Sequence, residues 1–301
     1  MKYPVTDLAA EARSEYMSRY AQANEGKIDG VEYSDVQEGA FSVSTIDILN
    51  EDGMRSVGKP CGRYVTVSCG KAVLGGEEAG EELRRVLAVE LREMAQRLAG
   101  RRVDAEFSLL VVGLGNAELT PDALGPQTVR SISVTRGDER GERMWNLSPR
   151  PCRISALATG VSAQTGLETA EIVRGLVSTT APDLVLAVDA LAARDSRHLA
   201  ATVQLSDTGI QPGSGIGGAR PALTKKTVGV PVLAIGVPTV VETGTLVRDA
   251  LSRFGIGEDM PEFTELLHGG KSFFVTPKEI DLLLPILASL LADSIEKAFT
   301  I

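Results

Sequence analysis

Three stretches of this chain are continuously apolar, at residues 107–115, 183–189 and 231–238. Apolar runs of this length are typical of strands that are buried on both faces of a sheet. Helical patterns lie between or after these runs, over residues 126–133, 166–179, 190–199 and 241–254. This alternation predicts the α/β class, with a mostly parallel sheet that is flanked by helices on both faces.

The first third of the chain has a different pattern. Residues 7–20 favour a short helix, whereas residues 40–49 and 64–69 favour strands. A long helix is predicted over residues 77–99, where large apolar side chains recur at helical spacing. No linker rich in proline or serine and no repeat interrupts the sequence, so we predict one domain over residues 1–301 with an elaborated N-terminal part.

The last helical pattern, over residues 277–299, carries a stripe of leucine and isoleucine. Core packing is the first explanation of such a stripe, and a contact between subunits is the second. The leucine-rich stretch at 282–292 is interrupted by Pro285 and is shorter than the roughly 20 residues that cross a bilayer. We therefore expect no membrane span.

Composition and charge narrow the range of partners. The formal net charge of −9 argues against nucleic acid and against an anionic membrane surface as partners, because both require clustered Lys and Arg. The sequence does not open with a signal-peptide pattern, and its 3 cysteines lack metal-ligand spacing. These features predict a protein of the reducing cytoplasm.

The scarcity of histidine limits the possible catalytic groups. Only His198 and His268 are available for a Ser-His-Asp or Cys-His arrangement, and neither a GxSxG nor an HExxH motif is present. One histidine together with carboxylates would still suffice for a metal site. If the protein is a hydrolase, carboxylates are the better candidates.

Two aspartates follow or end the buried strands. Asp122 lies in the proline- and glycine-containing loop after the first apolar run, and Asp189 ends the second run. Ligands of open α/β sheets bind outside the carboxyl ends of the strands. Either aspartate could instead cap a helix. If the two lie close together, one is protonated and the other ionised, which is the requirement for acid–base cleavage of a peptide without histidine or metal.

Other polar positions are candidate walls of a site. Glu168 opens a predicted helix, where it would also stabilise the helix N-terminus. The glycine-rich loop over 207–220 contains Gly213, Ser214, Gly215 and Arg220, and its backbone N–H groups could bind an oxyanion. Arg194 and Arg220 are candidates to contact an acidic substrate, although solvent-exposed surface is the simpler explanation of their charge. Incomplete glycine motifs make a nucleotide site a weak alternative.

Several of these segments together resemble a known family. The matching segments are TDLAAE (6–11), VGLGN (112–116), TPDALGP (120–126), QTGLET (164–169), VDALAAR (188–194), SDTGIQPGSG (206–215), IGVPTVV (235–241) and FVTPKEID (274–281). They occur in the same order in the germination proteases of endospore-forming bacteria, which are atypical aspartic endopeptidases. Differences at Gly218, at Glu242 and at the C-terminal end concern loops and specificity rather than Asp122 or Asp189.

The resemblance implies a specific activity. Asp122 and Asp189 match the two acids proposed as catalytic in that family, which needs no cofactor or metal. The implied fold is similar to that of the hydrogenase-maturation peptidases. The implied substrates are small acid-soluble spore proteins, the assembly is a homotetramer, and the location is the cytoplasm of the forespore and spore core.

The family is also made as a zymogen that removes its own N-terminal segment. TDLAAE resembles a family cleavage site, with the scissile bond between Asp7 and Leu8, so residues 1–7 are a predicted propeptide. Two alternatives remain open from the residues alone. One is a metallopeptidase of the hydrogenase-maturation type with a divalent ion between Asp122 and Asp189. The other is a non-catalytic module that binds a phosphorylated ligand through the loop at 209–218.

Overall fold

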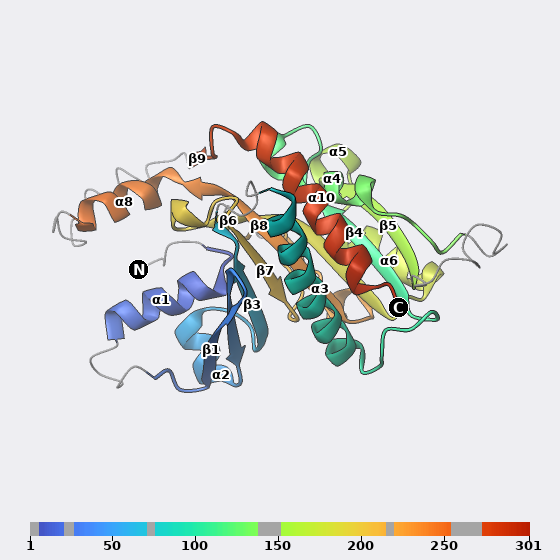
Figure 1. Ribbon diagram of the computed structural model, residues 1–301, viewed down its shortest axis with the longest axis horizontal. Helices are drawn as coiled ribbons and strands as arrows, with labels where there is room; N and C mark the ends of the chain where they lie inside the picture. The colour runs from blue at the N-terminus through green and yellow to red at the C-terminus, as the bar shows by residue number, and fades with distance from the viewer. Residues whose placement is uncertain (1–5, 21–26, 71–75, 138–151, 215–219, 254–272) are drawn as a thin grey trace.

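A large mixed sheet forms the centre of the molecule (Figure 1). The computed structural model describes residues 6–20, 27–70, 76–137, 152–214, 220–253 and 273–301. In these residues the strand order is β1-β2-β3-β7-β8-β6-β4-β5, and β9 pairs with β8. The strands are β1 (Val31–Glu38), β2 (Phe41–Ile48), β3 (Gly62–Ser68), β4 (Ser108–Leu114), β5 (Arg153–Gly160), β6 (Leu184–Ala193), β7 (Thr202–Ser206), β8 (Val232–Glu242) and β9 (Phe274–Val275).

The sheet has a parallel part and an antiparallel part. Strands β8, β6, β4 and β5 pair in parallel, whereas β1, β2, β3, β7 and β8 pair with their neighbours in antiparallel fashion. The predicted α/β class, with parallel core strands and flanking helices, is confirmed. The antiparallel part is the elaboration contributed mainly by the N-terminal third of the chain.

Helices cover both faces of this sheet. They are α1 (Ala9–Tyr20), α2 (Glu51–Val57), α3 (Glu77–Ala99), α4 (Leu124–Ser131), α5 (Ser162–Thr165), α6 (Thr169–Thr180), α7 (Lys225–Val228), α8 (Thr243–Arg253) and α10 (Ile280–Ala298). The long helices α3 and α10 lie side by side over one face, where they share the largest apolar core with α4 (Figure 1). On the other face α6 and α7 cover the parallel part, and α1 and α2 cover the antiparallel part.

The alternating strand near the N-terminus contributes to both layers. Phe41 and Val43 of β2 belong to the core beneath α3, whereas Ile46 and Ile48 pack beneath α1 and α2 on the opposite face. All four side chains are buried. Neither face of β2 is polar along its whole length. Helix α3 covers one face at the start of the strand, and α1 and α2 cover the opposite face at its end.

The helix expected over 190–199 is absent, and this prediction is wrong. Strand β6 continues to Ala193, and its last residues pair with β8 as far as Val241. Only a short 3₁₀ turn, η3 (Ser196–His198), follows. Alanine and leucine favour a helix locally, but pairing with a buried neighbouring strand outweighs that preference.

Other helix boundaries differ by a few residues. Helix 77–99 is found with the predicted bounds. Helix α6 begins at Thr169 rather than at Gly166, because Gly166 has a positive φ of 71° and ends the short helix α5. Strands β1, β5 and β7 were not predicted, because none of them contains a continuous apolar run.

Candidate active site

Asp189 lies in the interior of the sheet. It is the sixth residue of β6 (Leu184–Ala193) and not its last, so its expected place at a strand end is corrected. Its side chain is only 6% exposed, and its carboxylate accepts a hydrogen bond from the backbone N–H of Ala190 at 2.9 Å. Burial raises the pKa of Asp189 well above its ordinary value, and the nearby negative charges of Asp122 and Asp7 raise it further.

Asp122 reaches the same place from the loop after β4. It ends the 3₁₀ turn η2 (Thr120–Asp122), and its Oδ2 accepts a hydrogen bond from the backbone N–H of Asn116 at 2.7 Å. Burial raises the pKa of Asp122, while the Asn116 hydrogen bond and the charge of Arg220 lower it. The alternative capping role is not observed, because Ala123 is the N-cap residue of α4.

A side-chain hydrogen bond and a close approach of two backbone segments hold the Asp122 turn against the sheet. The hydroxyl of Thr239 on β8 donates to the carbonyl of Pro121 at 2.6 Å. Gly115 has a φ of 106°, and a side chain there would come within 2.0 Å of the Asp122 carbonyl oxygen. Glycine at this position therefore allows η2 to fold back over the end of β4. Asp122 and Asp189, far apart in sequence, are thereby brought close enough for the charge of Asp122 to act on Asp189.

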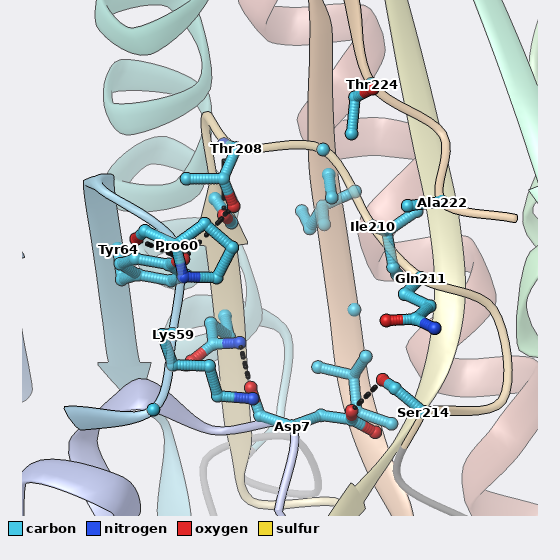
Figure 2. A pocket seen from close by; sticks show the side chains of 18 residues that line it. Asp7, Lys59, Pro60, Tyr64, Thr208, Ile210, Gln211, Ser214, Ala222 and Thr224 are labelled. Carbon is cyan, nitrogen blue, oxygen red and sulfur yellow. Dashed lines mark hydrogen bonds between the residues drawn. The ribbon is translucent and has the colours of Figure 1, made fainter. Parts of the chain in front are cut away.

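A third aspartate, Asp7, lies beside this pair and belongs to the N-terminal segment. Its backbone N–H donates to the carbonyl of Ala192 at 2.9 Å. Its carboxylate accepts hydrogen bonds from the backbone N–H of Ala192 at 2.8 Å and from the Ser214 hydroxyl at 2.7 Å. Figure 2 shows the Asp7 and Ser214 side chains pointing toward one another. The segment thus lies along β6 next to Asp189.

The residues after Asp7 are also anchored. Leu8 is fully buried against Leu191, Ala193 and Val241. Its backbone N–H donates to the Thr6 hydroxyl at 3.1 Å. The peptide bond between Asp7 and Leu8 is therefore held on both sides, and the charge of Asp7 acts on Asp189.

Glu11 fixes the first turn of α1 to the end of β6. Its buried carboxylate accepts hydrogen bonds from the backbone N–H groups of Arg194 and Asp195, at 2.7 and 2.9 Å. It also lies 2.6 Å from Nδ1 of His198, and this contact raises the pKa of the imidazole. The guanidinium of Arg194, a predicted substrate contact, forms an ion pair with Glu15 of the same helix.

Cavities lie on both sides of the N-terminal segment. One of about 260 Å³ is lined by Asp7, Tyr64, Gln204 and the loop after β7, and Figure 2 shows its wall. Another of about 290 Å³ lies between α1 and α2. Lys59 lines both; its ammonium group donates to the Thr6 carbonyl at 2.7 Å, and burial lowers its pKa.

The remaining predicted residues are distributed as follows. Glu168 is the N-cap residue of α6, and its backbone N–H donates to Glu171 of that helix at 3.0 Å. Gly213 adopts a φ of 73° in the turn that presents Ser214. Arg220 lies close enough to Asp122 to affect its pKa. Gly215 and His268 lie outside the described residues.

Sequence reasoning missed Gln204, whose side chain contacts the backbone of the N-terminal segment. It also missed Asn116 and Lys59. Polar side chains in strands and loops are usually solvent-exposed. Asn116 ends the matching segment VGLGN without being singled out there, and no motif marks Gln204 or Lys59.

The described part of the chain has neither a metal-binding cluster nor a membrane-spanning helix. No group of three or more His, Cys, Asp or Glu side chains there is arranged to hold a metal ion. Among the helices described, none is both long enough and apolar enough to cross a bilayer. The three cysteines are all described and have free thiols.

Comparison with known proteins gives a consistent result. Residues 8–262 match the model of the family described as germination protease. A germination protease of Clostridium acetobutylicum is 35% identical, over 97% of this chain and 94% of the relative. That of Caldanaerobacter subterraneus subsp. tengcongensis is 37% identical over 97% and 93%. That of Oceanobacillus iheyensis is 41% identical over 82% and 66%.

Proposed function

The chain belongs to the germination protease family, and on that premise we propose that it is an endopeptidase in which Asp122 and Asp189 together activate a water molecule. The observation that carries this proposal is the raised pKa of the buried Asp189, caused by burial and by the charges of Asp122 and Asp7. A raised pKa favours a pair that shares one proton, which is the state that acid–base catalysis requires.

The environments of the two acids support different roles for them. Asp189 is the more buried and has two acidic neighbours, so we assign the shared proton to it. Burial also raises the pKa of Asp122, but the Asn116 N–H and the charge of Arg220 oppose this shift and stabilise the ionised form, so we assign Asp122 the role of base. The two carboxyl groups titrate jointly, so this assignment describes the more populated of the two singly protonated states, with the proton on Asp189.

The proposed reaction is hydrolysis of a peptide bond. Asp122 takes a proton from water as the water oxygen bonds to the carbonyl carbon, and Asp189 gives its proton to the carbonyl oxygen. The carbon–nitrogen bond of the resulting diol then breaks. The leaving amine takes the proton from Asp122, and a diol hydroxyl returns one to Asp189. The products are a new carboxyl group and a new amine, and both aspartates regain their initial states.

We propose that the first bond cleaved is the chain's own Asp7–Leu8 bond, so that residues 1–7 are a propeptide. The Ser214 hydroxyl and the Ala192 N–H bind the Asp7 carboxylate. We propose that they bind the acidic residue before the scissile bond of other substrates in the same way. Residues 1–5 of this propeptide lie outside the described residues.

The finer biological assignment comes from the family resemblance. We propose small acid-soluble spore proteins as substrates, the cytoplasm of the forespore and spore core as the location, and a homotetramer as the assembly. Sedimentation velocity on the purified protein tests the assembly, because a monomer and a tetramer differ fourfold in mass.

The test of the mechanism is a pair of isosteric substitutions. We expect Asp122→Asn and Asp189→Asn each to slow cleavage of a peptide containing TDLAAE by at least about 1,000-fold, because each removes one partner of the acid–base pair. The control is Asp195→Asn, which changes an aspartate whose carboxylate contacts Arg197 on the surface. Wild-type rates in Asp122→Asn or Asp189→Asn would contradict the mechanism.

The same assay addresses the metallopeptidase alternative. We expect the wild-type rate to be unchanged after incubation with excess EDTA and dialysis. Loss of activity that is restored by a divalent ion would favour a metal between Asp122 and Asp189 instead.

A further inference from the structure

Gln204 is hydrogen-bonded on both sides of the Asp7–Leu8 peptide bond. Its Nε2 donates to the carbonyl oxygen of Asp7 at 2.8 Å, and its Oε1 accepts from the backbone N–H of Ala9 at 2.6 Å. The first contact is to the carbonyl of the proposed scissile bond itself. The second is to the next backbone N–H beyond that of Leu8.

These two contacts determine how the carboxamide is oriented. A carbonyl oxygen only accepts hydrogen bonds and a backbone N–H only donates, so Nε2 must face Asp7 and Oε1 must face Ala9. Gln204 is only 7% exposed, so water competes little with its carboxamide for these two hydrogen-bond partners. A buried amide that is satisfied on both sides is a rigid group.

The register of the sheet places Gln204 in line with Asp189. Gln204 on β7 is paired with Gly236 on β8, and Gly236 is paired with Asp189 on β6. Residues directly opposite one another project from the same face, so Gln204 and Asp189 flank Gly236 on one face of the sheet. A side chain at Gly236 would come within 2.6 Å of the Asp189 backbone oxygen. Glycine at this position also leaves room for the Leu191 side chain, whose Cγ would lie 2.7 Å from an added side chain.

We propose that Gln204 is a catalytic residue that binds the scissile peptide of every substrate, an inference that rests on the proposed peptidase function. Its Nε2 donor polarises the carbonyl and stabilises the negative charge that develops on the oxygen. Its Oε1 fixes the backbone beyond the cleavage point. Because both contacts are to main-chain atoms, this recognition is independent of substrate side chains, and side-chain specificity is left to contacts such as that of Ser214 with the acidic residue.

The test uses self-cleavage of the full-length chain. The scissile bond is already tethered in the site, so the first-order rate of appearance of a Leu8 N-terminus reports chemistry rather than substrate capture. We expect Gln204→Glu to cleave about 100- to 1,000-fold more slowly, as removal of an oxyanion donor does elsewhere. This variant retains an oxygen to accept from Ala9 and loses only the donor to Asp7.

Acidification separates this role from simple tethering. A protonated glutamate regains an O–H donor, so we expect the Gln204→Glu rate, relative to wild type, to rise as the pH falls. Gln204→Met, which is close in size but has no donor, should remain slow at every pH. The titratable groups around this position are Asp7, Lys59 and Tyr64 in the cavity and Asp189 on β6. Circular dichroism checks that each variant is folded, and the neutral Gln204→Met variant keeps the test available if the buried glutamate prevents folding.

The control is Gln37→Glu, the same substitution on the exposed strand β1, where the side chain donates to the Gly39 carbonyl at 3.2 Å. It should cleave at the wild-type rate. Rates within about threefold of wild type in folded Gln204→Glu or Gln204→Met would overturn the inference. If the wild-type chain does not cleave itself, the same variants are compared on the peptide containing TDLAAE. A wild type that cleaves neither substrate overturns the proposed function and the role of Gln204 with it.

Discussion

Asp189 is a carboxyl group in a place where apolar side chains are usual. Its neighbours along β6 are almost all buried and apolar, and its pairing partner is a glycine. A carboxylate buried in this way destabilises the folded protein in its charged form. We interpret this destabilisation as a consequence of catalysis, because the same burial keeps the proton on Asp189.

This interpretation predicts the pH dependence of stability. Since the folded state raises the pKa of Asp189, the folded protein binds more protons than the unfolded chain above pH about 4. The contribution of Asp189 to stability therefore falls as the pH rises from there to its folded pKa. Asp189→Asn has no such titration, and we expect it to have a higher free energy of unfolding than wild type at pH 7.

Urea unfolding of both proteins between pH 4 and 8 measures this difference. The advantage of the Asn variant should increase with pH across this range and be small at pH 4. A variant that is less stable than wild type at pH 7 would show that the ionised carboxylate contributes to folding, contrary to this prediction.

The sequence pattern singled out the two acidic residues of the candidate site but not its two amide side chains. Asp122 and Asp189 were identifiable because an acidic residue after an apolar run is unusual and has a known place in α/β sheets. Gln204 and Asn116 carry no comparable signal, because a neutral amide in a strand or loop is common. Their roles depend on which backbone groups the tertiary fold places opposite them.

Among the elements, the packing of α4 on β4 positions the site. Gly113 of β4 and Gly125 of α4 meet so closely that a side chain on Gly113 would lie 2.4 Å from the Gly125 carbonyl oxygen. A side chain on Gly125 would lie 2.5 Å from the carbonyl oxygen of Val188, the residue before Asp189. Both glycines therefore let α4, and with it the Asp122 turn, approach β6.

A single added methyl group tests this packing. We expect Gly113→Ala to lower the free energy of unfolding by about 1–3 kcal/mol, because backbone atoms rather than a flexible side chain must move. Gly175→Ala is the control, since nothing lies within 4 Å of a side chain there and Gly175 is in the interior of α6. It should raise stability by about 0.5–1 kcal/mol. Equal effects of the two substitutions in urea unfolding would contradict the close-packing argument.

Elements also show where sequence patterns are insufficient. The long helix at 77–99 was predicted correctly because its apolar stripe is regular over many turns. The continuation of β6 through Ala193 was missed because its residues also favour a helix. Only the neighbouring strand β8, far along the chain, decides between the two.

For the molecule as a whole, the site lies where the parallel and antiparallel parts of the sheet meet. Strands β6 and β8 are parallel to one another, and β7 is antiparallel to β8 (Figure 1). The first contributes Asp189 and the last contributes Gln204. The class of fold was predictable from the apolar runs. The antiparallel extension was not, because strands such as β1 are largely exposed and lack an apolar run.

The N-terminal segment connects this architecture to the proposed activity. Thr6, Asp7 and Leu8 lie in the site, and Glu11 anchors the helix that follows. A chain that cleaves its own Asp7–Leu8 bond would keep α1 and release residues 1–7.

Intact-mass and N-terminal analysis of the purified chain, incubated at mildly acid pH, tests the central claim most directly. We expect wild type to lose residues 1–7 and to begin at Leu8, while Asp122→Asn and Asp189→Asn keep Met1 under the same conditions. A wild-type chain that keeps Met1, or an Asp189→Asn chain that is trimmed to Leu8 as fast as wild type, would contradict it.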